Sequence, residues 1–292
     1  MTFAEKLKTI RKQAGMSQEK LAEKLGVSRQ AITKWETDAG IPDIENIMAI
    51  STLFDISIDE LLSKEKGTKK TEEYLYESVT EYDIAETKRF DMKFGGAKQI
   101  VLSGYDGEKI RVRLVSNTLP TLQKDIKVAI DVVKGRIDVE IVRKNGMTEA
   151  AAKEAVTIFV LLPSQYVRDI ELSAIAETAK LSSLACDSIE LNLKTQNVIL
   201  EDVSGTVEID CNLDMNVICR TLQGEIAINQ ISATSKISIP EEAVFTAVTK
   251  GIGTSISFEE NGKQTAAFDV PNADNIIELN GLKSELIISR TV

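Results

Sequence analysis

The 292-residue sequence contains no histidine. This absence removes His-based catalytic triads, the commonest general base and most zinc sites. Its three cysteines, Cys186, Cys211 and Cys219, follow no metal-ligand spacing, and so sparse a set does not predict a secreted disulfide scaffold. We therefore expect a protein that is not an enzyme, with no catalytic residues, no metal site and no cofactor.

Long hydrophobic runs are also absent. No apolar stretch approaches the roughly 20 residues needed to span a bilayer, and Met1–Ile10 is amphipathic and partly charged, unlike a signal peptide. We expect a cytoplasmic protein with no membrane partner. The composition, 43% hydrophobic and 27% charged, is that of a globular protein, and the length suffices for two domains.

The charge is distributed unevenly along the chain. A net charge of −10 argues against indiscriminate nucleic-acid binding. Residues 1–35, however, carry eight Lys and Arg against three acids, whereas residues 36–65 carry eight acids and a single Lys. The positive charge is thus concentrated in the one segment from which a DNA-facing surface could come.

Helical periodicity dominates the first 64 residues. Ser17 and Ser28 are placed to cap a second and a third helix, and Gly26 to end the second. A fourth helix follows Pro42, and a short fifth one is expected over Ile58–Leu62. We predict an all-α domain of five helices over residues 1–64, followed by a charged linker over residues 65–89.

Period-two alternation replaces this pattern from about Phe90 onward. Ile110–Leu114 and Ile137–Ile141 alternate as half-buried strands do. Residues 147–155 are locally helical or a long hairpin connection. We predict an all-β domain over residues 90–292.

An internal repeat of 18–19 residues lies within this second part. One apolar register is Ile170, Ile189, Val207 and Ile226; a second is Leu181, Leu200, Ile218 and Ile237; a third is Leu184, Val203 and Leu222. Three registers that agree favour a β-solenoid, a single-stranded β-helix, over a β-sandwich with chance spacing. In this arrangement Cys211 should face the core and Cys219 should point outward.

The segment Gln18–Glu36 resembles the helix-turn-helix of the phage-repressor, Cro and xenobiotic-response-element class. The residues that carry the resemblance are Ala22, Gly26, Ile32, Trp35 and Glu36, and the likeness extends over residues 3–63. It implies a lambda-repressor-like fold, a role as a transcriptional regulator, and an ion pair between Arg11 and Glu36 that links the first helix to the end of the third. Trp35 is expected to be a core anchor.

The same resemblance predicts an interface with double-stranded DNA. The helix that begins at Ser28 can lie in the major groove, where Arg and Gln side chains pair with guanine and adenine edges. Gln18 corresponds to a phosphate-binding position of the family, and Ser17 lies at a helix N-terminus that favours an anion. The expected DNA-binding residues are Ser17, Gln18, Ser28, Arg29, Gln30, Thr33 and Lys34.

One such unit covers little DNA, and proteins of this class pair two units on half-sites about 34 Å apart. We therefore expect a homodimer on a roughly palindromic operator. The second domain resembles an adhesin-like β-solenoid family through Val160–Pro163, Ser204–Val207 and Gln223–Ile226. That domain would oligomerise the chain, or sense an unknown protein or small effector.

A scaffold is the competing hypothesis. There, solenoids stack end to end while the helix-turn-helix only tethers them to DNA. Ile276–Asn280 and Leu286–Ser289 would favour such stacking if their edges were uncovered.

Overall fold

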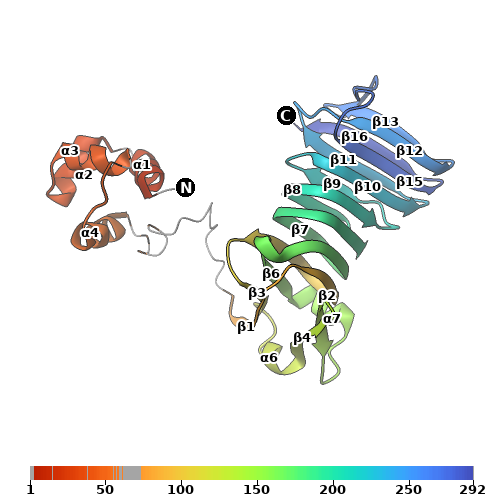
Figure 1. Cartoon of the computed structure of the whole chain (residues 1–292), viewed down its shortest axis with the longest axis horizontal. Coiled ribbons are helices and arrows are strands. Elements are labelled where there is room, and N and C mark those ends of the chain that lie inside the picture. Colours follow the sequence, from red (N-terminus) through yellow and green to blue (C-terminus); the bar gives the residue numbers. More distant parts are fainter. Residues whose placement is uncertain are drawn as a thin grey trace. The chain divides into compact units, whose positions relative to one another are not determined.

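The computed structural model describes residues 3–14, 16–37, 39–54, 56, 58, 61 and 74–291. The chain divides into a helical unit, Met1–Glu73, and a larger β unit, Tyr74–Val292. Figure 1 shows the elements of both units, each of which is described by itself. Among the described residues, no helix is long and apolar enough to cross a membrane.

Four helices of the helical unit are described: α1 (Phe3–Gln13), α2 (Gln18–Leu25), α3 (Arg29–Glu36) and α4 (Ile44–Phe54). Their apolar faces meet in one core, in which Leu7, Leu21, Ile32 and Ile50 are fully buried. Of the expected fifth helix, Ile58 and Leu61 are helical, and its other residues lie outside the described part of the chain.

The turn between α2 and α3 forms as its sequence predicts. The Ser17 hydroxyl accepts a hydrogen bond from the Lys20 amide, and the Ser28 hydroxyl accepts one from the Ala31 amide. Gly26 ends α2 with φ of 67°, a left-handed conformation that costs glycine little because it has no Cβ. Two capped helices joined by a tight turn are therefore fixed by local interactions.

The β unit begins earlier than the sequence indicates. Within the expected linker, β1 (Tyr76–Asp83) pairs antiparallel with β3 (Lys109–Ser116), and β2 (Lys88–Tyr105) also begins there. The linker prediction is therefore wrong over its second half, because β1 obtains its hydrogen bonds from a strand far along the chain. Residues 65–73 lie outside the described residues.

The remaining elements follow in chain order. They are α6 (Leu122–Asp125), β4 (Ile126–Val133), β5 (Arg136–Arg143), α7 (Glu149–Ala155), β6 (Thr157–Pro163), a 3-10 turn (Ser164–Tyr166), β7 (Val167–Lys194), β8 (Asn197–Asp210), β9 (Asn216–Cys219), β10 (Gln223–Ile231), β11 (Thr234–Pro240), β12 (Thr246–Ile252), β13 (Ser255–Glu260), β14 (Lys263–Thr265), β15 (Ile276–Leu282) and β16 (Glu285–Thr291). Helix α7 confirms the first of the two alternatives for residues 147–155, a local helix. Helix α6 was not predicted.

Strands of successive repeats pair in parallel. Ile189 lies opposite Val207, which lies opposite Ile226, as the first apolar register predicts. Because equivalent residues stack, their side chains form continuous buried rows inside the unit. The structure therefore bears out a large β-rich unit with an 18–19-residue repeat.

The second register is wrong at its last two members, Ile218 and Ile237. Leu200 lies opposite Cys219 rather than Ile218, and Val217 lies opposite Ile237. As a result Cys219 is buried and Ile218 is exposed, the reverse of the expectation, whereas Cys211 faces the core as predicted. The shift arises because β9 follows a turn at residues 211–215, which changes the count between repeats.

The final strands are not free edges. β15 lies between β10 and β12, and β16 lies between β11 and β13, all in parallel. The edges of Ile276–Asn280 and Leu286–Ser289 are therefore covered, and the condition under which they would favour stacking is not met. The last repeat of the chain lies between two earlier repeats, and this spatial order cannot be predicted from the order of the repeats in the sequence.

Candidate nucleic-acid interface

Helix α3 presents one polar face to solvent. Ser28, Arg29, Gln30, Thr33 and Lys34 are all exposed, whereas Ile32 and Trp35 on the opposite face are buried. The helical period places the exposed set on one side of α3, starting at its N-terminus. The five residues predicted from this helix are therefore brought together on one surface.

Gln18 connects this surface to the interior of the unit. Its Nε2 donates to Glu36 Oε2 at 2.8 Å, and its Oε1 accepts from the Thr33 hydroxyl at 3.2 Å. The amide is thus held at both ends, and no acceptor for the second N–H of Nε2 is found among the described residues. A side chain held in this way keeps its orientation before any ligand arrives.

Behind Gln18 lies a buried ion pair. Arg11 Nε and Nη2 donate to the two carboxylate oxygens of Glu36 at 2.6 and 2.8 Å, and Arg11 Nη1 donates to the Met16 carbonyl at 2.7 Å. This two-point geometry joins α1 to the end of α3, as the family resemblance implies. Trp35 is buried in the apolar core of the unit, which agrees with a core role.

The Glu36 carboxylate is kept ionised by these contacts. Burial would raise the pKa of Glu36, but hydrogen bonds from Arg11 and Gln18 and the positive charge of Arg11 outweigh it, so that the pKa is lowered. The pKa of Arg11 is raised, chiefly by its hydrogen bond to Glu36. Both groups therefore stay charged over the physiological pH range.

The links from Gln18 to Glu36 and Thr33 were not predicted. The three residues lie up to 18 positions apart, and their contact depends on how α2 crosses α3. A glutamine at the start of a helix gives no sign of two partners. Ser17 stays exposed at the N-terminus of α2, where its hydroxyl serves as a cap.

The β unit offers no comparable chemical cluster among its described residues. No group of three or more acids and cysteines there could hold a metal ion. Cys186, Cys211 and Cys219 are buried free thiols. Burial raises the pKa of Cys186 to about 12 and that of Cys219 to about 11. Thiols in this state are poor nucleophiles at neutral pH.

Comparison with known proteins bears on the helical unit. A helix-turn-helix family model matches residues 7–61. The HTH-type transcriptional activator BcrR of Enterococcus faecalis is 50% identical over 66 residues, which cover 23% of this chain and 32% of BcrR. The HTH-type transcriptional regulator ImmR of Bacillus subtilis is 33% identical over 91 residues, which cover 31% of this chain and 72% of ImmR.

The chain belongs to the helix-turn-helix transcriptional regulators. It spans about a third of the length of BcrR, so the likeness to that activator concerns only one part of each protein. For the rest of the regulator, the crystal structure of a candidate cell adhesion protein from Clostridium sporogenes covers 74% of this chain and 99% of its own, at 14% identity and a TM-score of 0.36. A TM-score of this size does not establish a common fold for the β unit.

Proposed function

We propose that the regulator binds double-stranded DNA in a sequence-specific manner, with the N-terminal half of α3 in the major groove. The observation that carries this proposal is the exposed polar face of α3, whose opposite face anchors the core. A helix mounted in this way can enter the groove without unfolding its own support.

Each residue of the face has a chemical role in this proposal. Arg29 can donate two hydrogen bonds to guanine O6 and N7, and Gln30 can pair with adenine N6 and N7. The Thr33 hydroxyl already donates within the protein, so that its methyl group is what it offers to a thymine methyl. Lys34 reaches a base or a phosphate, and Ser28 adds a contact near the helix start.

Gln18 and Ser17 are proposed to hold the DNA backbone. The free N–H of Gln18 and the first amides of α2 can donate to the same phosphate. Such contacts fix the position of the helix without reading sequence. The hydrogen bonds to Glu36 and Thr33 would set Gln18 in place for this task.

We further propose that two copies bind together on a palindromic operator. A single unit offers only one short recognition helix, and paired units bind two half-sites one helical turn apart. We also propose that the regulator acts in the cytoplasm. The regulator would not be an enzyme in either unit.

We infer that the β unit is a β-solenoid attached to a lambda-repressor-like domain. Parallel pairing of equivalent residues at a separation of 18–19 supports this architecture. Its role would be to join copies of the chain or to sense a partner. Covered edges at β15 and β16 lend no support to the stacking scaffold.

Selection of bound fragments from genomic DNA tests the proposal. The full-length regulator should enrich one inverted repeat, and a variant carrying Arg29→Ala and Gln30→Ala should enrich none. If both proteins enriched the same repeat, Arg29 and Gln30 of α3 would not be the residues that read the bases.

A further inference from the structure

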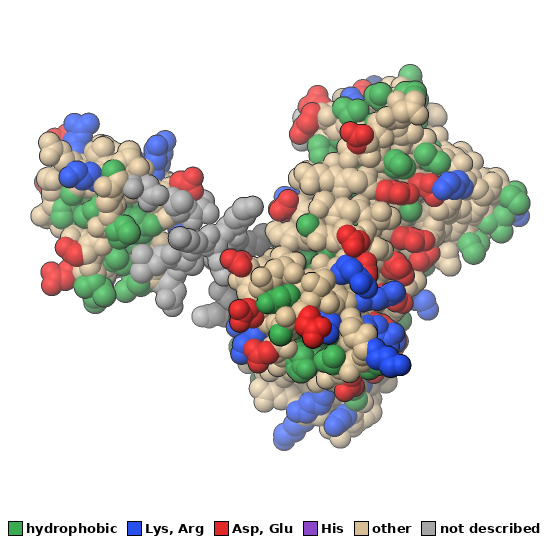
Figure 2. Space-filling model, viewed as in Figure 1, with side chains coloured by type: hydrophobic (Ala, Val, Ile, Leu, Met, Phe, Trp, Pro, Cys, Tyr) green, Lys and Arg blue, Asp and Glu red, His purple; other side chains and the backbone are tan. Residues whose placement is uncertain are grey.

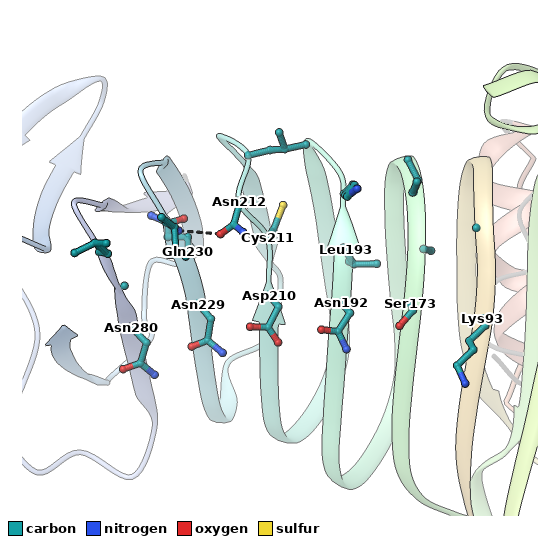
Figure 3. Close-up of a pocket in the computed structure, with 18 of the residues that line it drawn as sticks. Lys93, Ser173, Asn192, Leu193, Asp210, Cys211, Asn212, Asn229, Gln230 and Asn280 are labelled. Atoms are coloured by element: carbon teal, nitrogen blue, oxygen red, sulfur yellow. Dashed lines mark hydrogen bonds between the residues drawn. The ribbon is translucent and has the colours of Figure 1, made fainter. Parts of the chain in front are cut away.

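A shallow groove of about 1150 Å³ crosses the strands of the β unit. Its lower wall in Figure 3 is a row of polar side chains at equivalent positions of adjacent strands. In spatial order the row is Lys93, Ser173, Asn192, Asp210, Asn229 and Asn280. The groove therefore runs along the direction in which the repeats stack.

Aliphatic side chains face this row, and Lys194, Asn212 and Gln230 also line the groove. Leu213, Ile231 and Leu282 line it with exposures of 45%, 55% and 42%, and Ile231 lies opposite Leu282 in the parallel pairing. Neighbouring aliphatic side chains on one wall are more than the scattered exposure that any surface shows. Covering them with an apolar partner would be favourable.

Acidic side chains border the polar wall. At the position two residues before it, the strands carry Glu171, Glu190, Glu208, Ala227 and Glu278 in spatial order; the first three are partly exposed and Glu278 is buried. Figure 2 shows acidic side chains, with Lys and Arg side chains among them, on the visible face of the β unit. The two outer acids are neutralised, since Glu171 pairs with Arg89 at 2.8 Å and Glu278 with Lys250 at 2.6 Å.

The middle of this border keeps its negative charge. Glu208 accepts a hydrogen bond from Asn229, but among the described residues no cation pairs with Glu190, Glu208 or Asp210. These three acids outnumber Lys194, the exposed cation that lines the same stretch of the groove. A second copy of the same face would bring like charges together, which is unfavourable. The chemistry that complements the groove is a cationic segment with an aliphatic side.

We propose that this groove docks a cationic amphipathic α-helix of a partner protein. Adjacent strands are about 4.8 Å apart, and an α-helix advances about 5.4 Å per turn, so that nearly one turn falls on each strand of the row. An extended peptide repeats its side chains every ~6.7 Å and would fall out of step within two strands. The row of six residues spans about 24 Å, the length of a helix of about 16 residues.

In this arrangement the helix presents aliphatic residues at i, i+4 and i+7 to the wall of Leu213, Ile231 and Leu282. Lys or Arg residues on its adjacent side lie over Glu190, Glu208 and Asp210. The proposal goes beyond DNA binding and does not depend on it, because every residue of the groove belongs to the β unit.

A fluorescent probe peptide tests the proposal on the full-length regulator. The probe is an alanine-rich helix of about 16 residues with Leu on one stripe and Lys beside it, and its binding is followed by fluorescence anisotropy. We expect it to bind roughly ten-fold more tightly than a scrambled peptide of the same composition, a Glu-for-Lys version, or a peptide with alternating Leu and Lys. Added salt should weaken the binding.

Matched variants locate the site. Asp210→Lys and Ile231→Asp should each weaken probe binding by roughly ten-fold or more. Glu242→Lys and Ile218→Asp change an exposed acid and an exposed aliphatic outside the groove and should leave it unchanged. Far-UV circular dichroism verifies that each variant folds, and its DNA affinity should equal that of the unmodified chain.

Equal binding of the helical and scrambled peptides would overturn the proposal, and so would equal losses in the groove and control variants. Tighter binding of the alternating peptide would show that the groove prefers an extended segment, and would overturn the proposal of a helix. None of these outcomes bears on DNA binding, which is measured separately with the same variants.

Discussion

At the scale of single residues, Gln18 illustrates how the interior of the helical unit sets its surface. The amide is held between the buried Glu36 carboxylate and the Thr33 hydroxyl. Both partners lie on α3, so α2 and α3 are joined by polar contacts beside their apolar core. The face of α3 that we propose to read DNA is thereby ordered in advance, which would lower the entropy lost on binding.

Arg29 is the residue whose removal should be most specific. Arg29→Ala is expected to cost about 1–3 kcal/mol at one base pair of the operator, because a bidentate contact to guanine is lost. Competition among operators with single base changes measures this effect. As a control, Lys12→Ala on α1 should weaken binding evenly across sequences or leave it unchanged. An Arg29→Ala protein that still distinguishes every base pair would contradict the assignment.

Glu36 should make the stability of the helical unit fall in acid. Its pKa is lowered in the folded protein, so its contribution to the free energy of unfolding is complete above the ordinary glutamate value of about 4.3 and is lost as the pH falls through the lowered value. Chemical unfolding followed by the fluorescence of Trp35, the single tryptophan, reports this unit. The stability difference between the unmodified chain and Glu36→Gln should therefore shrink below that pH. Glu23→Gln, which changes an exposed acid of the same unit, is the matched control for the substitution itself.

The buried thiols give a further prediction. With pKa values raised to about 12 at Cys186 and about 11 at Cys219, both are protonated at neutral pH. A thiol reagent monitored by absorbance should therefore label the native chain far more slowly than the denatured chain. Since the folded pKa values are raised, the stability that these thiols contribute is complete below about pH 9 and declines through pH 11–12. Rapid labelling of Cys219 in the native chain would contradict its burial and would support the prediction that it points outward.

At the scale of elements, the glycines of the parallel strands set how closely the repeats approach. Gly205 in β8 has φ of +113°, and a Cβ there would lie 1.9 Å from the Cys186 carbonyl oxygen of the neighbouring strand. Gly135, between β4 and β5, has φ of +84° but no atom within 4 Å of such a Cβ. Both positions have a positive φ that disfavours any residue with a Cβ, but only Gly205 also has a backbone atom too close to such a Cβ.

Gly205→Ala should therefore destabilise the β unit more than Gly135→Ala does. We expect the difference to be about 1–3 kcal/mol, the usual effect of overpacking. Denaturant unfolding followed by far-UV circular dichroism measures it, with Trp35 fluorescence as a check that the helical unit is unaffected. If the two variants were equally stable, close approach of the strands at Gly205 would not limit the fold.

Local signals explain which elements could be predicted. Ser17, Gly26 and Ser28 act on residues within four positions, so the α2–α3 turn and the exposed face of α3 follow from sequence. Strand β1 depends instead on β3, whose Ser116 pairs with Tyr76, and its charged residues resemble a linker. The orientation of Cys219 was predicted wrongly because the length of the turn before β9, which sets the register of that strand, could not be predicted from the sequence.

At the scale of the whole molecule, chain order and spatial order differ. The repeat formed by β15 and β16 lies between strands that precede it in sequence. Periodicity could predict that repeats stack in parallel, but it could not predict which repeat ends the stack. The groove also escaped prediction, because its polar and aliphatic walls come from strands spread over residues 93–282.

The central claim is that the exposed face of α3 reads the edges of paired bases. It is tested most directly by the affinity of the full-length regulator for its selected duplex, relative to bulk competitor DNA, at a fixed moderate salt concentration. Specific binding is expected to be roughly 10³-fold tighter or more, and the Arg29→Ala, Gln30→Ala double variant should lose most of that ratio. A folded regulator that bound every duplex equally would contradict the account.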